Sequence, residues 1–222
     1  MASEEISRNE MIRRFKMLKT PAINDILDQK GLFHQVLPPQ IQAIEKGMRV
    51  AGPALTIKGT PTIVDKPEYF QIGMKAYEML EPGQIVIFDT AGDQATAHWG
   101  EMISTTTRVK GCGGAVLDGG VRDVDAIERL GFPVFARYRT PSDIRGRWRY
   151  VEINLQIRIG ETIINPGDWV IGDENGVVVV PKELTVQVLL EAEKVMEVEK
   201  KIWEELQAGQ SPIQVFAKYG RF

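Results

Sequence analysis

Three short apolar segments, separated by segments of helical character, constrain the fold of this chain more than any other feature. They lie at 84–88, 114–117 and 132–136. Apolar runs this short are typical of strands that are buried on both faces. Helical patterns at about 68–80, 99–110 and 124–130 alternate with them. This alternation predicts an α/β core that contains some parallel strand pairing.

The N-terminal segment carries helix signals. Ser7 and Glu10 have the spacing of a capping box and predict the start of one helix. Thr20 is predicted to cap a second helix that begins at Pro21 and stops at Gly31. Both helices would lie outside the alternating strands and helices of the core.

The rest of the chain adds short strands and a long closing helix. An alternating apolar pattern at 49–63 predicts a strand, and glycine- and asparagine-rich turns separate four further short strands, at 150–159, 162–164, 169–171 and 177–180. Such a block usually pairs antiparallel. We predict one domain over 1–222, with a helical N-terminal segment at about 3–30, a core at about 49–181 and C-terminal helices at about 184–218.

Composition excludes several classes of protein. The 222 residues are 43% hydrophobic and carry a net charge of −3, so nothing global attracts nucleic acid or an anionic membrane. One cysteine and two histidines exclude a disulfide framework and Cys-rich zinc sites. The longest uncharged stretch, 31–44, is too short to span a membrane, and the charged N-terminus lacks the apolar core of a signal peptide. We therefore expect a cytoplasmic protein.

Two glycine-bearing loops follow buried strands and carry the residues suited to chemistry. The first is Asp118-Gly-Gly-Val-Arg-Asp123, and the second runs from 92 to 101 into a helix. Ligands of open α/β sheets bind at the carboxyl ends of strands. Arginine binds carboxylates with a planar fork, aspartate is a hard ligand for Mg²⁺, and the free amides at a helix start hold anions. The loops predict an anion-plus-metal site, although each could also be a plain turn.

Four segments in order, at 97–101, 114–123, 132–136 and 166–181, resemble the RraA-like superfamily. That group contains the class II 4-hydroxy-4-methyl-2-oxoglutarate/4-carboxy-4-hydroxy-2-oxoadipate aldolases and the regulator of ribonuclease E activity A. The resemblance covers about 22–209. It implies an α/β/α sandwich of the swivelling phosphohistidine-domain type, with a mixed sheet, helical N- and C-terminal extensions and assembly as homotrimers or homohexamers with sites between subunits.

The aldolase signature of this group is an acid, twenty residues, Arg-Asp, a short gap and another acid. The chain offers Glu101, twenty residues, Arg122-Asp123, four residues and Glu128, with Glu101 standing where well-known members have Asp. The resemblance implies that Asp123 binds Mg²⁺ or Mn²⁺ directly and that Glu101 acts through metal-bound water. It also implies that Arg122 binds the carbonyl and carboxylate end of the substrate.

Further substrate contacts follow from the same resemblance. The backbone amides of Gly100, Glu101, Met102 and Ile103 would hold the substrate carboxylate. Glu199, on the closing helix, could enter the site of a neighbouring subunit, although most acids on such a helix are simply solvated.

These parts support class II aldolase chemistry. Cleavage of the C3–C4 bond of a 4-hydroxy-2-oxo acid leaves a pyruvate enolate, whose charge a divalent cation and Arg122 would stabilise. We therefore expect a metal-dependent lyase that cleaves a 4-hydroxy-2-oxo dicarboxylic acid, such as 4-hydroxy-4-methyl-2-oxoglutarate, to pyruvate and a second oxo acid. Oxaloacetate decarboxylation passes through the same enolate and is an expected side activity.

Three alternatives remain open at this point. The main one is a non-catalytic RraA-type regulator that binds ribonuclease E. A Schiff-base aldolase would need a lysine in one of the two loops, and neither loop contains one. RNA binding is less favoured, and it would use a basic and aromatic run of Arg137, Tyr138, Arg139, Arg145, Arg147, Trp148, Arg149 and Tyr150.

Several other polar residues have unremarkable interpretations. His98 could contact substrate, but a packed histidine is at least as common, and His34 has no recognisable partner. Turn residues are expected at Asp93, Asp168 and Asp173. Cys112 is expected to be a small core residue.

Overall fold

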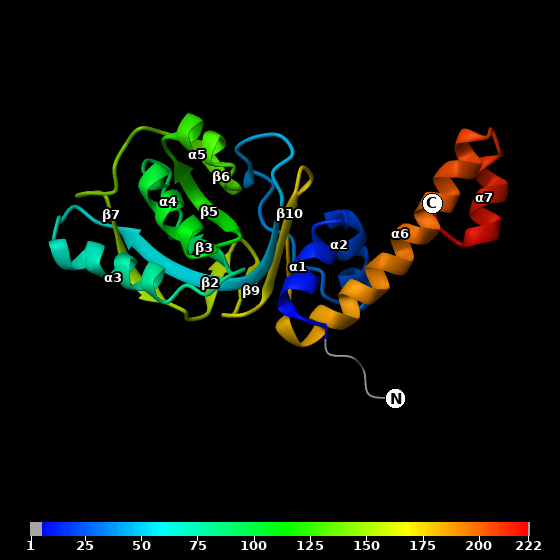
Figure 1. Ribbon diagram of the computed structural model, residues 1–222, viewed down its shortest axis with the longest axis horizontal. Coiled ribbons are helices and arrows are strands. Elements are labelled where there is room, and N and C mark those ends of the chain that lie inside the picture. The colour runs from blue at the N-terminus through cyan, green and yellow to red at the C-terminus, as the bar shows by residue number, and fades with distance from the viewer. Residues whose placement is uncertain (1–5, 222) are drawn as a thin grey trace.

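The computed structural model describes residues 6–221 and shows a mixed α/β fold with a nearly closed mixed sheet (Figure 1). Its helices are α1 (Arg8–Phe15), α2 (Thr20–Gln29), α3 (Pro67–Glu78), α4 (Glu101–Val109), α5 (Val124–Leu130), η1 (Lys182–Leu184), α6 (Thr185–Gln207) and α7 (Pro212–Tyr219). Its strands are β1 (Gln42–Ala43), β2 (Val50–Pro61), β3 (Ile85–Asp89), β4 (Ala97–Trp99), β5 (Gly114–Val121), β6 (Val134–Arg139), β7 (Trp148–Ile153), β8 (Ile157–Ile159), β9 (Thr162–Ile164), β10 (Trp169–Asp173) and β11 (Gly176–Val180).

The main sheet has the order β1-β6-β5-β3-β2-β10-β11, with β4 beside β5 and β7 beside β2. The strands β2, β3, β5 and β6 pair parallel, which confirms the parallel pairing expected from the alternation of strands and helices. The pairs β10–β11 and β8–β9 are antiparallel, as expected for the later block.

The segment 35–43 brings the two edges of this sheet close to closure. At one end, Leu37 donates its N–H to the carbonyl of Val177 at 2.9 Å, and Val179 donates its N–H to the carbonyl of Gln35 at 2.8 Å. At the other end, Gln42–Ala43 pairs antiparallel with β6. One short stretch of chain thus pairs with both outer strands, β11 and β6.

The alternation of side chains along each strand separates an inner core from two outer ones. On β3, Ile85 and Ile87 face the inner core, whereas Val86 and Phe88 face an outer core. The inner core is completed by the β8–β9 hairpin. One outer core packs against α3 and α5, and the second packs against α1, α2 and α6.

The layers differ in one respect from the expected α/β/α sandwich. A sandwich has helices on both faces of its sheet, but here the β8–β9 hairpin and the segment 35–43 close the inner face. The inner face is thus covered by a hairpin and a short extended segment and not by a helix layer. The relation to the swivelling phosphohistidine domain stays a prediction.

The N-terminal helices follow their sequence signals with one correction. The Ser7 hydroxyl accepts a hydrogen bond from the N–H of Glu10 at 3.3 Å, so the predicted cap is confirmed. Thr20 is not the cap of α2, because Lys19 occupies that position. Instead, the N–H and hydroxyl of Thr20 donate to the Asp173 carboxylate, at 2.9 and 2.7 Å, and attach α2 to the β10–β11 turn. Residues 3–5 of the predicted helical segment lie outside the described residues.

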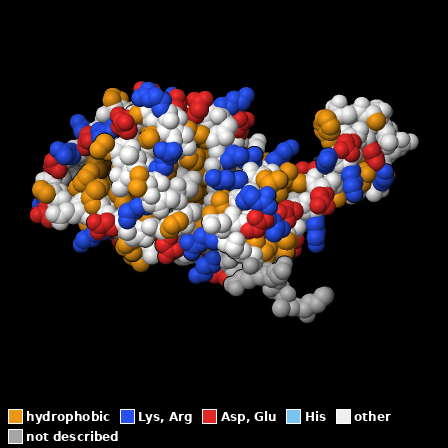
Figure 2. Space-filling model, in the orientation of Figure 1, with side chains coloured by type: hydrophobic (Ala, Val, Ile, Leu, Met, Phe, Trp, Pro, Cys, Tyr) orange, Lys and Arg blue, Asp and Glu red, His pale blue; other side chains and the backbone are white. Residues whose placement is uncertain are grey.

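The C-terminal helices form an arm. Figures 1 and 2 show the far half of α6 and all of α7 projecting from the body of the molecule. Trp203, Ile213 and Phe216 on this arm are more than half exposed, at 62%, 81% and 54%. Within residues 6–221, no helix combines the length and the apolar composition needed to cross a bilayer.

Strand β5 is longer than its sequence pattern indicates. The apolar run predicts 114–117, but pairing continues through Gly120 and Val121, which lie beside β4 and β6. A side chain on Gly120 would collide with the Tyr138 ring, since an added Cβ would lie 2.4 Å from it. The glycines therefore belong to the strand, and the functional loop begins only at Arg122.

Candidate active site

Arg122 and Asp123 lie with the start of α4 around one cavity of about 200 Å³ at the carboxyl ends of β4 and β5. The cavity is lined by residues from β4, α4, the end of β5, α3, β7 and the segment that joins β6 to β7. They are Phe70, Ala97, His98, Trp99, Gly100, Met102, Ile103, Arg122, Asp123, Asp143, Ile144, Arg145 and Tyr150. The two loops singled out in the sequence therefore do meet at one place.

Arg122 and Asp123 are held at the point where β5 ends. Arg122 donates its backbone N–H to the carbonyl of Trp99 at 3.0 Å. Asp123 has a φ of 57°, in the left-handed region that Asp and Asn tolerate better than most residues. Its Oδ2 lies 3.6 Å from the Nε of Arg122. The turn thus presents a guanidinium and a carboxylate side by side.

The start of α4 faces this pair. The N–H of Glu101 donates to Oδ2 of Asp123 at 3.2 Å. The first N–H groups of a helix have no acceptor within the helix, so those of Met102 and Ile103 are available to an anion in the cavity. Trp99 fixes this turn, because its Nε1 donates to the Ser104 hydroxyl at 2.7 Å. Backbone donors and the Arg122 guanidinium therefore meet at the same cavity.

Asp143 completes the charged group, and the sequence analysis missed it. Its Oδ2 accepts a hydrogen bond from Nη1 of Arg122 at 2.9 Å, and its Oδ1 accepts from the N–H of Arg145 at 2.8 Å. Burial acts to raise the pKa of Asp143, but these two hydrogen bonds outweigh it and hold the pKa below its ordinary value. Asp143 could have been found from the sequence, because Pro141-Ser142-Asp143 is a turn-forming sequence that follows the predicted strand at 132–136.

A family model described as RraA-like (Aldolase/RraA) matches residues 20–179. The chain belongs to the RraA-like family. A curated relative from Halalkalibacterium halodurans, 32% identical over 185 residues and 83% of either chain, is named "Putative 4-hydroxy-4-methyl-2-oxoglutarate aldolase".

Solved structures agree with this family fold. One protein, described among novel cellulases from microbes associated with the gut ecosystem, has a TM-score of 0.85 and 33% identity and covers 90% of both chains. Streptomyces coelicolor RraAS2, described as an unusual member of the RNase ES inhibitor RraA protein family, has a TM-score of 0.76. At 24% identity, over 90% of this chain and 96% of that chain, it shows the fold alone.

Three acids of this RraA-like chain lie apart from the cavity or at its margin. The side chain of Glu101 is exposed and does not line the cavity, so only its backbone N–H contacts Asp123. Glu128 lies on α5. Glu199 lies on the projecting arm, where it pairs with Arg221 at 3.2 Å. Within one chain, Glu199 therefore does not reach Asp123, and its predicted entry into a neighbour's site stays a prediction.

His98 is a packed residue. Its side chain is fully buried, and its Nδ1 accepts the N–H of Gly120 at 3.2 Å. Its Nε2 lies 3.3 Å from the Asp93 carboxylate. Burial acts to raise the pKa of Asp93, but hydrogen bonds from His98 and Thr96 outweigh it and hold the pKa well below its ordinary value. The ring thus links β4 to the glycines of β5, and Asp93 orders the loop before β4.

A divalent cation would find an oxygen ligand at Asp123. Its Oδ2 is engaged by Glu101, while no hydrogen bond to its Oδ1 is found among residues 6–221. The same part of the chain holds no group of three or more His, Cys, Asp or Glu side chains that could form an all-protein metal site. Mg²⁺ is often bound by one or two carboxylates, with water and substrate as its other ligands. The residues present fit that mode.

The remaining sequence predictions concern structural residues. Burial raises the pKa of Cys112 to about 11, as expected of a core thiol. Asp168 accepts the N–H of Asn165 at 2.7 Å and is a turn residue, as predicted. His34 has no partner that the sequence indicates, and in the structure its Nδ1 lies 2.9 Å from the Glu161 carboxylate at the surface.

The arginine run does not form one continuous basic surface. Arg137 pairs with Asp118, and Arg139 donates to the carbonyl of Ile44. Arg147 donates to the carbonyl of Asp143 at 3.0 Å. These three guanidiniums are engaged in contacts within the chain, and RNA binding along this run stays a less favoured alternative.

Gly100 is required by the close approach of α4 to Asp123. An added Cβ would lie 2.7 Å from Oδ2 of Asp123 and 3.1 Å from Cγ of Arg122. Its backbone is extended, with a φ of −165°, so alanine adds a collision without backbone strain. We expect Gly100→Ala to lower turnover by about tenfold or more, since displacement by about 1 Å can cost a hundredfold. Thr105→Ala, at an exposed position of α4, is the control. Unchanged turnover in Gly100→Ala would contradict the placement of Asp123.

Proposed function

We propose that this RraA-like protein is a divalent-metal-dependent aldolase. Its substrate would be a 4-hydroxy-2-oxo dicarboxylic acid such as 4-hydroxy-4-methyl-2-oxoglutarate, cleaved to pyruvate and a second oxo acid. The observation that carries the proposal is the meeting of Arg122, Asp123 and the start of α4 at one cavity. The name of the Halalkalibacterium halodurans relative supports it.

The pyruvate half of the substrate would be held by its carboxylate. The Arg122 guanidinium supplies a planar pair of donors, and its hydrogen bond from Nη1 to Asp143 helps to fix its orientation. The free N–H groups of Met102 and Ile103 would add donors from the helix start. Donors from Arg122 and from the helix start would together bind the carboxylate and orient the adjacent 2-oxo group toward Asp123.

The cation, Mg²⁺ or Mn²⁺ held by Asp123, would supply Lewis acidity that stabilises an enolate oxygen. Arg122 would stabilise the same negative charge as the C3–C4 bond breaks. Glu101 begins α4 next to Asp123, and we assign it to accept the proton of the C4 hydroxyl through an intervening water. The same water would then return a proton to C3 of the enolate, which gives pyruvate. The same groups would support decarboxylation of oxaloacetate, because that reaction also yields the pyruvate enolate.

The proposal is tested by a coupled assay of pyruvate release. We expect turnover of 4-hydroxy-4-methyl-2-oxoglutarate and of oxaloacetate with Mg²⁺, complete loss with EDTA and recovery when Mg²⁺ or Mn²⁺ is restored. Activity that survives chelation would contradict metal dependence. Reduction with borohydride in the presence of pyruvate then reports a lysine mechanism, which we do not expect because no lysine is among the described residues that line the cavity.

We also propose assembly into a trimer or hexamer in which the arm of one chain contacts the next. The exposed Trp203, Ile213 and Phe216 give the arm an apolar surface, and Glu199 lies on it. Light scattering after gel filtration measures the mass of the assembly. A monomer at micromolar concentration would contradict this assembly and the proposed role of Glu199 in a neighbour's site.

A non-catalytic regulator of ribonuclease E is the second candidate. It is favoured by the fold shared with RraAS2, which is described within an RNase ES inhibitor family. Inhibition of ribonuclease E by the Asp123→Asn variant, together with the absence of pyruvate release from the wild type, would support it over the aldolase.

A further inference from the structure

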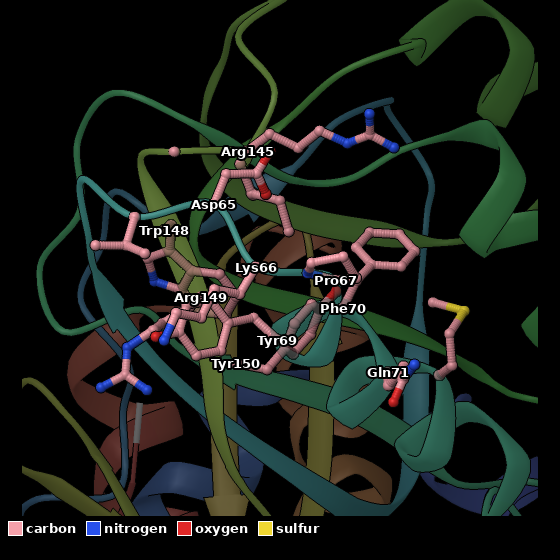
Figure 3. Close-up of a pocket in the computed structure, with 14 residues that line it drawn as sticks. Asp65, Lys66, Pro67, Tyr69, Phe70, Gln71, Arg145, Trp148, Arg149 and Tyr150 are labelled. Carbon is pink, nitrogen blue, oxygen red and sulfur yellow. The ribbon is translucent and has the colours of Figure 1, made fainter.

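A second cavity of about 420 Å³ lies between α3, β7 and the segments that precede them (Figure 3). The mechanism proposed above does not use it. Its lining includes Lys66, Phe70, Met74, Arg145, Arg149 and Tyr150. We call it the α3–β7 pocket. Figure 2 shows hydrophobic side chains on the surface at this end of the molecule.

The α3–β7 pocket adjoins the cavity that contains Arg122 and Asp123. Four residues line both spaces: Phe70, Ile144, Arg145 and Tyr150. A ligand whose carboxylate lies at Arg122 would therefore extend past these shared residues into the larger space. For a 4-hydroxy-2-oxo acid, the part that extends is the substituent at C4, which leaves as the second product.

The walls of the α3–β7 pocket suit a flat apolar group. Phe70 and Tyr150 meet edge to face, with ring centroids 6.4 Å apart. The Tyr150 hydroxyl is 3.0 Å from that of Tyr77, and this buried hydrogen bond helps to fix the Tyr150 ring. Gly73 allows this packing, because an added Cβ would lie 2.5 Å from the Tyr150 ring. Fixed aromatic walls favour a ring-sized ligand, because binding then requires little further ordering of side chains and its entropy cost is small.

The charge of the α3–β7 pocket favours an anion at its far end. Its lining holds three cations, Lys66, Arg145 and Arg149, and one acid, Asp65, so the net charge of the lining is positive. Within the described residues, none of the three cations lies within 4.0 Å of a carboxylate oxygen. The Arg149 guanidinium instead lies over the Tyr69 ring, 4.9 Å from its centroid.

The two arginines occupy different ends of the pocket. Figure 3 shows that Arg145 and Arg149 extend in opposite directions. Arg145 is shared with the cavity of Asp123, whereas Arg149 is not. A carboxylate on the far side of a ring-sized group would therefore meet Arg149.

We propose that the α3–β7 pocket binds the C4 substituent of the substrate and selects an aromatic-sized group that carries a carboxylate. This inference rests on the proposed aldolase function. It names the substrate class: a pyruvate aldol adduct whose second half is an acidic aromatic aldehyde or ketone, rather than a second pyruvate.

The test compares three adducts of pyruvate by their kcat/KM for pyruvate release. They are 4-hydroxy-4-methyl-2-oxoglutarate, the adduct of benzaldehyde and the adduct of 4-carboxybenzaldehyde. We expect the last to be preferred over the first by about tenfold or more, since a charge-assisted hydrogen bond in a binding site contributes a factor of this size. The benzaldehyde adduct should fall between them.

Two variants identify the pocket as the source of this preference. Met74→Trp is designed to fill the pocket. It should lower kcat/KM for both ring adducts by about tenfold and change kcat/KM for 4-hydroxy-4-methyl-2-oxoglutarate by less than about twofold. Met79→Trp, an exposed position just beyond α3, is the matched control. Arg149→Gln should remove the advantage of the carboxylated ring over the plain ring, and Arg158→Gln, on β8, is its control.

Two results would overturn the inference without contradicting the proposed aldolase function. One is an equal loss of kcat/KM for all three adducts in Met74→Trp, and the other is a higher wild-type kcat/KM for 4-hydroxy-4-methyl-2-oxoglutarate than for the ring adducts. If the wild type cleaves none of them, the proposed function fails. Calorimetric titration of the 4-carboxybenzaldehyde adduct into the wild type and Met74→Trp then tests the pocket alone. Binding that the variant weakens by about tenfold supports it, and absence of binding to the wild type overturns it.

Discussion

Replacing Asp123 by Asn is expected to lower pyruvate release by about a thousandfold or more, the scale of losing a group that stabilises charge in the transition state. Asn keeps the shape of the side chain and an oxygen that can accept the N–H of Glu101. It also tolerates the left-handed backbone, with its φ of 57°. The loss would therefore reflect the missing negative charge, which we propose holds the cation, and not a misfolded turn.

The matched control for this change is Asp125→Asn, two residues further along. Asp125 is exposed on α5, and among the described residues its ion-pair partner is Arg129, at 3.0 Å. It should retain nearly full turnover, because an ion pair this exposed to water adds little to stability. The pyruvate assay, repeated over a range of Mg²⁺ concentrations, measures both variants. Turnover above a tenth of wild type in Asp123→Asn would contradict the assignment of Asp123.

Arg122→Gln should have the second largest effect, a loss of about a hundredfold or more in kcat/KM for every substrate, whatever its C4 substituent. In the proposed function the guanidinium binds the 2-oxo acid half that all these substrates share, so its loss would weaken both substrate binding and stabilisation of the enolate. Arg122→Lys should restore little of this loss, because an ammonium does not reproduce the planar fork that Asp143 orients.

Arg129→Gln provides the control, since Arg129 is an exposed arginine on the neighbouring helix. Thermal unfolding should be similar in the two glutamine variants, because the Arg122 side chain is 39% exposed and its ion pairs are at the surface of the cavity. If kcat/KM fell only for substrates with large C4 groups, Arg122 would contact the C4 substituent and not the 2-oxo acid half, which would contradict its assignment.

Much of the fold could be predicted because its signals are local. The helix α5 and the strand β9 have the bounds that their patterns indicate, at 124–130 and 162–164. The cap at Ser7 depends on residues three apart. By contrast, β1 and β4 were missed, because strands of two or three residues have too little pattern and exist only through pairing with β6 and β5.

The sequence alone determined the alternation of strands and helices, the positions of Arg122 and Asp123 after a buried strand, and the helix start that faces them. These follow from side-chain periodicity and from chemical groups close together in the chain. Only the tertiary structure decided that the sheet curls until 35–43 reaches both of its edges, that Asp143 binds Arg122, and that α3 and β7 form a second pocket beside the first. Periodicity tells which side of a strand is buried but not what covers it, because contacts between distant segments depend on how the whole chain packs.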